Sequence, residues 1–219
     1  LPSFLQKYDP DTLRYYLSIN MPENHDTDFN WPDFVEKINS ELIAAYGNFV
    51  HRVLTLGARM PDNKSLSSYE NLDLCKDAMK KLEDIHHNIT SSLERHRYKE
   101  ALRYAMSAAQ FGNQLLQAAT PWKYLKESDN TSAAESFARL SFGWRISRFL
   151  AITTQPFLPF SAKRLWASLG ESGDVAMVDW YSAIDWNVEF KWNSKPAEPL
   201  FERLDLEAIL EDEMGLVDS

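Results

Sequence analysis

Apolar residues recur at helical spacing along most of the chain. Leu42, Tyr46, Phe49 and Val53 follow one another at intervals of 4, 3 and 4 residues, which is typical of the core-facing side of a helix. They lie within a helix predicted over residues 31–59, where Pro32 suits the first turn. Further long helices are predicted over residues 68–94, 98–118 and 131–154. Four long amphipathic helices with short connections favour an antiparallel bundle, so the predicted fold class is all-α.

The two ends of the chain depart from this pattern. Asp9, Pro10 and Asp11 form a helix-start signal ahead of "TLRYYLSI". From about Gly170 the chain becomes rich in tryptophan, and residues 188–192 alternate between apolar and polar. That stretch predicts either a short strand or, more readily, an extended arm over the bundle, followed by a short acidic helix near "LDLEAILED". We therefore expect a connecting segment over 1–30, a helical bundle over 31–170 and a C-terminal arm over 171–219.

A polar pair lies opposite the apolar stripe of the first long helix. Asn48 and Arg52 are four residues apart, so they share a face that points well away from Leu42 and its companions. Two interpretations remain open for a planar amide and a planar guanidinium on one free face. They are part of an ordinary solvated surface, or they bind something planar.

Composition and charge disfavour several classes of function. The net charge of −9 among 219 residues argues against broad, non-specific binding of nucleic acid, although a local contact by a few residues is compatible with it. Seven glycines disfavour a Gly-rich phosphate loop. The single cysteine, Cys75, excludes an internal disulfide and fits a reducing compartment. No apolar stretch reaches the length of a membrane span, and we expect a cytoplasmic protein without a membrane partner.

The sequence contains no convincing catalytic or metal site. Its histidines do not fall into a metal-binding spacing, and a G-x-S-x-G nucleophile motif is absent. The five histidines are His25, His51, His86, His87 and His96. A helical metalloenzyme is therefore the least favoured function, and we expect the chain to bind no metal.

The second feature of interest is Trp122, which follows Thr120 and Pro121 just past a predicted helix end. The proline holds the indole stiffly, and two interpretations are again open. Trp122 packs on the bundle as a core cap, or it stands exposed and stacks on a nucleic-acid base, for about 1–3 kcal/mol. Lys123 and Lys126 nearby are candidate phosphate contacts.

Several segments in order resemble the C-terminal, anticodon-binding part of methionyl-tRNA synthetases. The similarity begins at "FLQKYDPDTLRYYLSINMPENHDTDFNW" and continues through "VEKINSELIAAYGNFVHRV", where Asn39, Asn48 and Arg52 fit the family's spacing. It extends over "AATPWKYLK", "ISRFLAITTQPFLPFSAKRLW" and "PLFERLD", so it covers nearly the whole chain. The resemblance implies an antiparallel helix bundle of the class I synthetase anticodon-binding type.

The resemblance also implies roles for individual residues. Trp122 corresponds to the family's tryptophan that stacks on the first base of the CAU anticodon, a cytosine, and Pro121 shapes its loop. Asn48 and Arg52 correspond to the residues that hydrogen-bond the edge of that base. Asn39 is the weakest member of the pattern, and we expect it to help start the helix.

The family's catalytic signatures, His-x-Gly-His and Lys-Met-Ser-Lys-Ser, do not occur in the chain. ATP and methionine are therefore expected to bind a missing catalytic domain of the same enzyme, and this fragment to be catalytically inactive with no cofactor. Apolar residues of its first segment, such as Leu1, Phe4, Tyr15 and Tyr16, are expected to be exposed where that domain docks. The expected partners are tRNA for methionine and that domain. The alternative function is a stand-alone helical interaction module derived from the synthetase fold.

Overall fold

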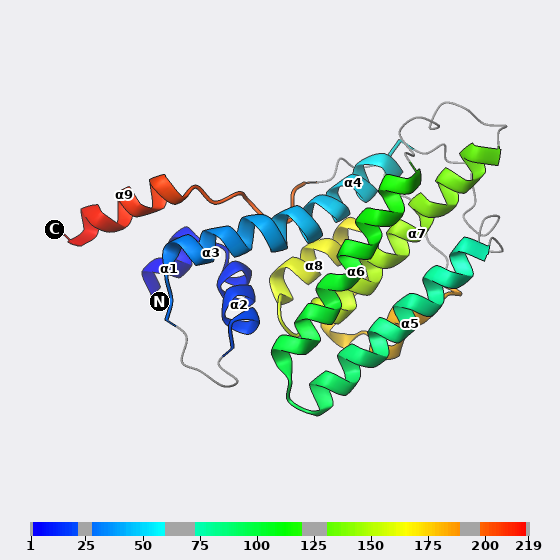
Figure 1. Cartoon of the computed structure of the whole chain (residues 1–219), viewed down its shortest axis with the longest axis horizontal. Coiled ribbons are helices and arrows are strands. Elements are labelled where there is room, and N and C mark those ends of the chain that lie inside the picture. The colour runs from blue at the N-terminus through cyan, green and yellow to red at the C-terminus, as the bar shows by residue number, and fades with distance from the viewer. Residues whose placement is uncertain (1, 22–27, 60–72, 120–130, 189–197, 218–219) are drawn as a thin grey trace.

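The computed structural model describes residues 2–21, 28–59, 73–119, 131–188 and 198–217. It is built from helices, which lie side by side over most of the molecule and extend to one side at both termini (Figure 1). Within the described residues there is no β-strand, so the prediction of an all-α fold is confirmed. None of the described helices is both long enough and apolar enough to span a lipid bilayer.

The first long helix has three consecutive parts. These are α3 (Trp31–Lys37), the π-helix η1 (Ile38–Gly47) and α4 (Asn48–Gly57). Asn30 starts the helix, because its side chain accepts a hydrogen bond from the Asp33 N–H. In the π-helical part, the Ala45 carbonyl accepts a hydrogen bond of 2.8 Å from the side chain of Asn113. A side chain inserted into the backbone ladder is a recognised cause of such irregularity.

The remaining bundle helices are α5 (Asp73–Glu94), α6 (Tyr98–Ala119) and α7 (Thr131–Thr154), followed by the shorter α8 (Pro159–Ser168). The predicted helices over 98–118 and 131–154 are confirmed. The helix predicted from residue 68 is described from Asp73, because residues 60–72 lie outside the described part. The bulky residues expected in the core of α7 are all buried, namely Phe137, Leu140, Trp144 and Phe149.

The N-terminal segment forms α1 (Pro2–Lys7) and α2 (Pro10–Ile19). Asp9 caps α2 as predicted, with its side chain accepting from the Asp11 N–H. The expected exposure of Tyr15 and Tyr16 is wrong: they are only 1% and 3% exposed. Tyr15 lies beneath η1 and donates a hydrogen bond to Glu41, and Tyr16 packs edge-on against Phe34.

The tryptophan-rich segment after α8 packs against the bundle through two 3-10 turns, η4 (Val175–Met177) and η5 (Trp180–Ile184). The Trp180 indole donates to Thr90 on α5, and the Arg148 guanidinium on α7 donates to the Ser182 carbonyl. The expected acidic helix is present as α9 (Leu206–Val217), which lies beside α3 (Figure 1). Residues 189–192, which carry most of the predicted alternation, lie outside the described part.

Candidate nucleic-acid interface

The long helix has the two faces that the sequence predicts. Leu42, Tyr46, Phe49 and Val53 are fully buried, whereas the Asn48 side chain is exposed and Arg52 is partly exposed on α4. The polar pair therefore lies on the outer side of a helix whose inner side is buried in the core. A base could reach Asn48 without any rearrangement of the backbone.

Two glycines hold α4 close to its neighbours. A Cβ at Gly112 of α6 would lie 2.4 Å from two ring carbons of Phe49, and a Cβ at Gly143 of α7 would lie 2.9 Å from a Val53 methyl. We call these four residues the apolar seam. Because Phe49 directly follows Asn48 and Val53 directly follows Arg52, the seam fixes the position of the polar pair.

The end of α6 lies near the end of α4. Ala45 contacts Asn113, and Val53 and Leu116 both lie against Gly143, so α4 and α6 run in the same general direction. Both helices end on the same side of the bundle (Figure 1). Residues 120–130 lie outside the described part, and they include Pro121, Trp122, Lys123 and Lys126. The proximity of these four residues to Asn48 and Arg52 therefore stays a prediction.

Asn39 has a role that differs from the expected one. It does not start the helix, which begins at Trp31. Its side chain donates to the Leu204 carbonyl at 2.8 Å and accepts from the Leu204 N–H at 3.0 Å. An amide satisfies both backbone groups of one residue in this way, because it carries a donor and an acceptor. Asn39 thus fixes the chain just ahead of α9.

A polar cluster with the buried Asp11 at its centre joins α2 to α8 and to the turn between α7 and α8. The carboxylate of Asp11, fully buried, accepts a hydrogen bond of 2.6 Å from the Ser161 N–H and so caps α8 from another helix. Arg14 donates to the Phe157 carbonyl at 2.7 Å, and Arg164 pairs with Asp9 at 2.7 Å. We call these contacts the polar clamp. Sequence reasoning missed it because its members are some 150 residues apart.

Burial raises the pKa of the Asp11 carboxyl, and the hydrogen bond from the Ser161 N–H opposes that rise without cancelling it. Among the described residues, no three His, Cys, Asp or Glu side chains lie close enough together to hold a metal ion. His86 is instead buried beneath η5, with its Nε2 atom 3.2 Å from the Trp180 carbonyl. Burial lowers its pKa, because it disfavours the charged form of the ring.

Comparison with known proteins finds family matches along most of the chain. Residues 1–54 match the family model described as tRNA synthetases class I (M), and residues 60–207 match the anticodon binding domain of methionyl tRNA ligase. The second match covers more than half of the chain. The chain belongs to the family of methionyl-tRNA ligase anticodon-binding domains.

Relatives of the same name support this membership. The chain is 37% identical over 218 residues to a methionine–tRNA ligase of Methanopyrus kandleri, covering 97% of the chain and 31% of the relative. It is 34% identical over 225 residues to a methionine–tRNA ligase of Bacillus cereus, covering 98% of the chain and 36% of the relative. The chain thus spans about a third of the length of these relatives.

The fold is shared with solved structures of the family. The apo methionyl-tRNA synthetase of Mycobacterium tuberculosis superposes with a TM-score of 0.78 at 18% identity, covering 93% of this chain and 40% of the other. Asn48 and Arg52 fall within the first family match, and Trp122 within the second. The candidate interface therefore draws on both matched regions.

Proposed function

We propose that this chain selects tRNA for methionine by binding its CAU anticodon, as part of a methionine–tRNA ligase. The observation that carries the proposal is the match to the anticodon-binding family together with the outward position of Asn48 and Arg52 on a rigidly held helix. In this proposal the pair hydrogen-bonds the edge of the first anticodon base, and Trp122 stacks on the face of that base, with Pro121 shaping its loop.

The chemistry of cytosine suits these side chains. The base offers acceptors, which an arginine can donate to, and an amino donor, which the asparagine carbonyl can accept from. Proteins commonly read single-stranded RNA by stacking a splayed base on an aromatic ring and bonding its edge. A different first base would leave some of these groups unpaired, at a cost of about 1–3 kcal/mol for each buried group.

The whole enzyme would join methionine to this tRNA with ATP, in the cytoplasm. ATP and methionine would bind a catalytic domain of the same enzyme, and the present chain would use no cofactor of its own. Lys123 and Lys126 would contact the phosphates of the anticodon loop. The net charge of −9 fits a narrow mode of binding, in which a few residues choose the base and few phosphates are neutralised.

The experiment is a titration of the chain with a fluorescently labelled anticodon hairpin that carries CAU, against the same hairpin with its first base changed. The wild-type chain should prefer the cytosine hairpin. Arg52→Ala and Trp122→Ala should each weaken cognate binding about tenfold or more, which corresponds to the loss of about 1.4 kcal/mol. Arg52→Ala should also lose the preference between the two hairpins.

Arg95→Ala is the matched control, because Arg95 is an exposed arginine at the end of α5. It removes the same charge and should leave the preference for cytosine unchanged. Equal binding of both hairpins by the wild-type chain would contradict the proposal and favour an interaction module that has lost tRNA reading.

A further inference from the structure

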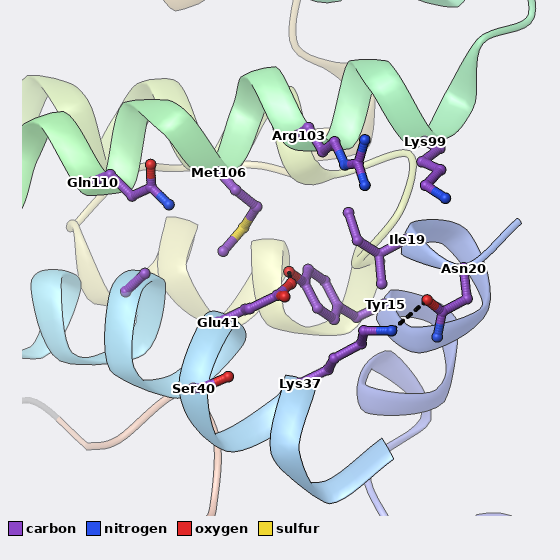
Figure 2. A pocket seen from close by; sticks show the side chains of 11 residues that line it. Tyr15, Ile19, Asn20, Lys37, Ser40, Glu41, Lys99, Arg103, Met106 and Gln110 are labelled. Atoms are coloured by element: carbon purple, nitrogen blue, oxygen red, sulfur yellow. Dashed lines mark hydrogen bonds between the residues drawn. The ribbon is translucent and has the colours of Figure 1, made fainter. Parts of the chain in front are cut away.

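A pocket of about 560 Å³ opens between α2, η1 and α6 (Figure 2). Its apolar floor includes Ile19 and Met106, and the Tyr15 hydroxyl donates a hydrogen bond of 2.7 Å to Glu41 across it. Burial raises the pKa of Tyr15, and the Glu41 carboxylate raises it further. The phenol therefore stays protonated and keeps Glu41 in place at any ordinary pH.

Three cations surround the pocket in a chain whose net charge is −9. Lys99 and Arg103 are one turn apart on α6, and their side chains extend from that helix toward Ile19 and Asn20 (Figure 2). In the parts of α2, η1 and α6 that the structure describes, neither has a carboxylate within ion-pair distance. Lys37 lies on the opposite wall, where Asn20 at 2.6 Å and Asp33 at 3.0 Å hold its ammonium group.

This arrangement suits one phosphate better than a run of phosphates. Lys99 and Arg103 offer unpaired donors from one side, and the positioned Lys37 faces them from the other. Glu41 limits the charge that the pocket can accept, because a second phosphate would lie against its carboxylate. The pocket thus differs from the broad basic surface of a non-specific nucleic-acid binder.

The pocket lies on the same face of the long helix as the base-reading pair. Glu41 and Ala45 line it, and Asn48 and Arg52 follow at intervals of 3 and 4 residues along that stripe. From Glu41 to Arg52 the helix advances 11 residues, or roughly 16 Å at about 1.5 Å per residue. That is the length of about four or five stacked nucleotides at about 3.4 Å each.

We propose that Lys37, Lys99 and Arg103 bind a single backbone phosphate of the anticodon arm, about four or five nucleotides on the stem side of the base read by Asn48 and Arg52. The inference rests on the proposed anticodon binding and adds a second, sequence-independent point of contact. Two contacts at fixed separation would set the orientation of the arm, since phosphate contacts position and base contacts specify.

The test compares the wild-type chain with a Lys99→Gln/Arg103→Gln double variant, using the labelled CAU hairpin over a range of salt concentrations. The double variant should bind roughly tenfold or more weakly at 0.1 M salt, and the slope of log K against log salt should fall by about 0.7 to 0.9, the change expected for one phosphate. Its preference for cytosine should stay unchanged. Lys163→Gln, which removes an exposed charge from α8, is the control and should change little.

Neutral methylphosphonate linkages, introduced one at a time into the hairpin, would locate the phosphate. One position, four or five nucleotides from the first anticodon base, should weaken binding to the wild-type chain and have no further effect on the double variant. Additive losses at every position would overturn the proposal. So would a double variant that keeps the affinity and salt slope of Lys163→Gln.

Inorganic phosphate distinguishes a small free anion from the RNA backbone. Tight binding of phosphate that the double variant loses, with normal RNA affinity, would show a site for a free anion and overturn the RNA proposal. The preference for cytosine reports separately on the proposed function. The chain could show no preference for cytosine and still depend on Lys99 and Arg103 for RNA binding. That result would contradict the proposed function but support the phosphate site.

Discussion

The apolar seam and the polar clamp hold neighbouring parts of the molecule by opposite means. In the seam, Phe49 and Val53 fill space that only glycine leaves open on α6 and α7. In the clamp, Asp11 and Arg14 of α2 satisfy backbone groups at the α7–α8 turn. The first is a steric fit of apolar groups, and the second is a set of hydrogen bonds and an ion pair.

The difference matters because each region supports a different part of the proposed tRNA site. The seam lies directly beneath Asn48 and Arg52, so the pair proposed to read the base has a support that neither pH nor salt changes. The clamp holds α2, which contributes Tyr15 and Ile19 to the pocket. The proposed phosphate site therefore depends on groups that titrate, and substitutions can separate the two supports.

Gly112→Ala should have the largest effect among the changes that leave the side chains of the long helix in place, because it breaks the seam. The new Cβ would lie 2.4 Å from two carbons of the Phe49 ring, which is itself fully buried. Overpacking of this kind costs about 1–3 kcal/mol, and the better helix propensity of alanine offsets only part of it. We expect the free energy of unfolding to fall by about 1–2 kcal/mol in chemical denaturation.

Phe49→Leu in the Gly112→Ala background supplies the check on this explanation. The smaller side chain relieves the contact, so the double variant should lose less stability than the sum of the two single changes. Additive losses would mean that the ring moves aside without cost and that the seam is not a steric fit. Gly143→Ala should cost less than Gly112→Ala, because its closest contact is longer, at 2.9 Å.

Asp11→Ala tests the clamp and should have an intermediate effect. It leaves the Ser161 N–H without its acceptor at the start of α8, and loss of a helix cap costs about 0.5–2 kcal/mol. Asp11→Asn keeps an oxygen for this N–H and is the matched control at neutral pH. Equal losses in the two variants, measured by denaturation, would show that capping is not what Asp11 contributes.

The clamp, unlike the seam, should also respond to pH. The folded pKa of Asp11 is raised above its ordinary value of 3.8, first of all by burial. Its titration therefore stabilises the fold most below about pH 4, and that contribution is lost as the pH rises through the folded pKa. The stability of wild type relative to Asp11→Asn should decrease between pH 4 and pH 7, while that of wild type relative to Gly112→Ala stays constant.

The two regions also differ in how far the sequence predicts them. The apolar half of the seam is readable, because Phe49 and Val53 recur at the period of a helix. Gly112 and Gly143 give a weaker signal: a glycine inside a helical pattern costs stability and so suggests a packing reason. Which residue fills the space cannot be read from spacing, because it depends on how three helices cross.

The clamp and the pocket lie beyond what local patterns predict. Asp11 is read correctly as part of a helix start, yet its carboxylate caps a different helix 150 residues away. Lys99 and Arg103 look like an ordinary solvated helix face, and only the packing of α2 beneath them makes a pocket. The expected role of Asn39 in starting the helix is wrong, because its partner Leu204 is distant in sequence and cannot be read from local spacing.

Asn48→Ala should have the smallest effect on the fold. It tests whether the exposed face of α4 is independent of the apolar seam on the buried face. Asn48 is exposed, so the free energy of unfolding should change by no more than about 0.5 kcal/mol, and cognate hairpin binding should weaken about tenfold. Its neighbour Phe49 is the matched contrast, since Phe49→Ala should cost about 3–5 kcal/mol of stability. If Asn48→Ala instead lowers stability and binding together, the polar face belongs to the fold, and reading of the base must be sought elsewhere.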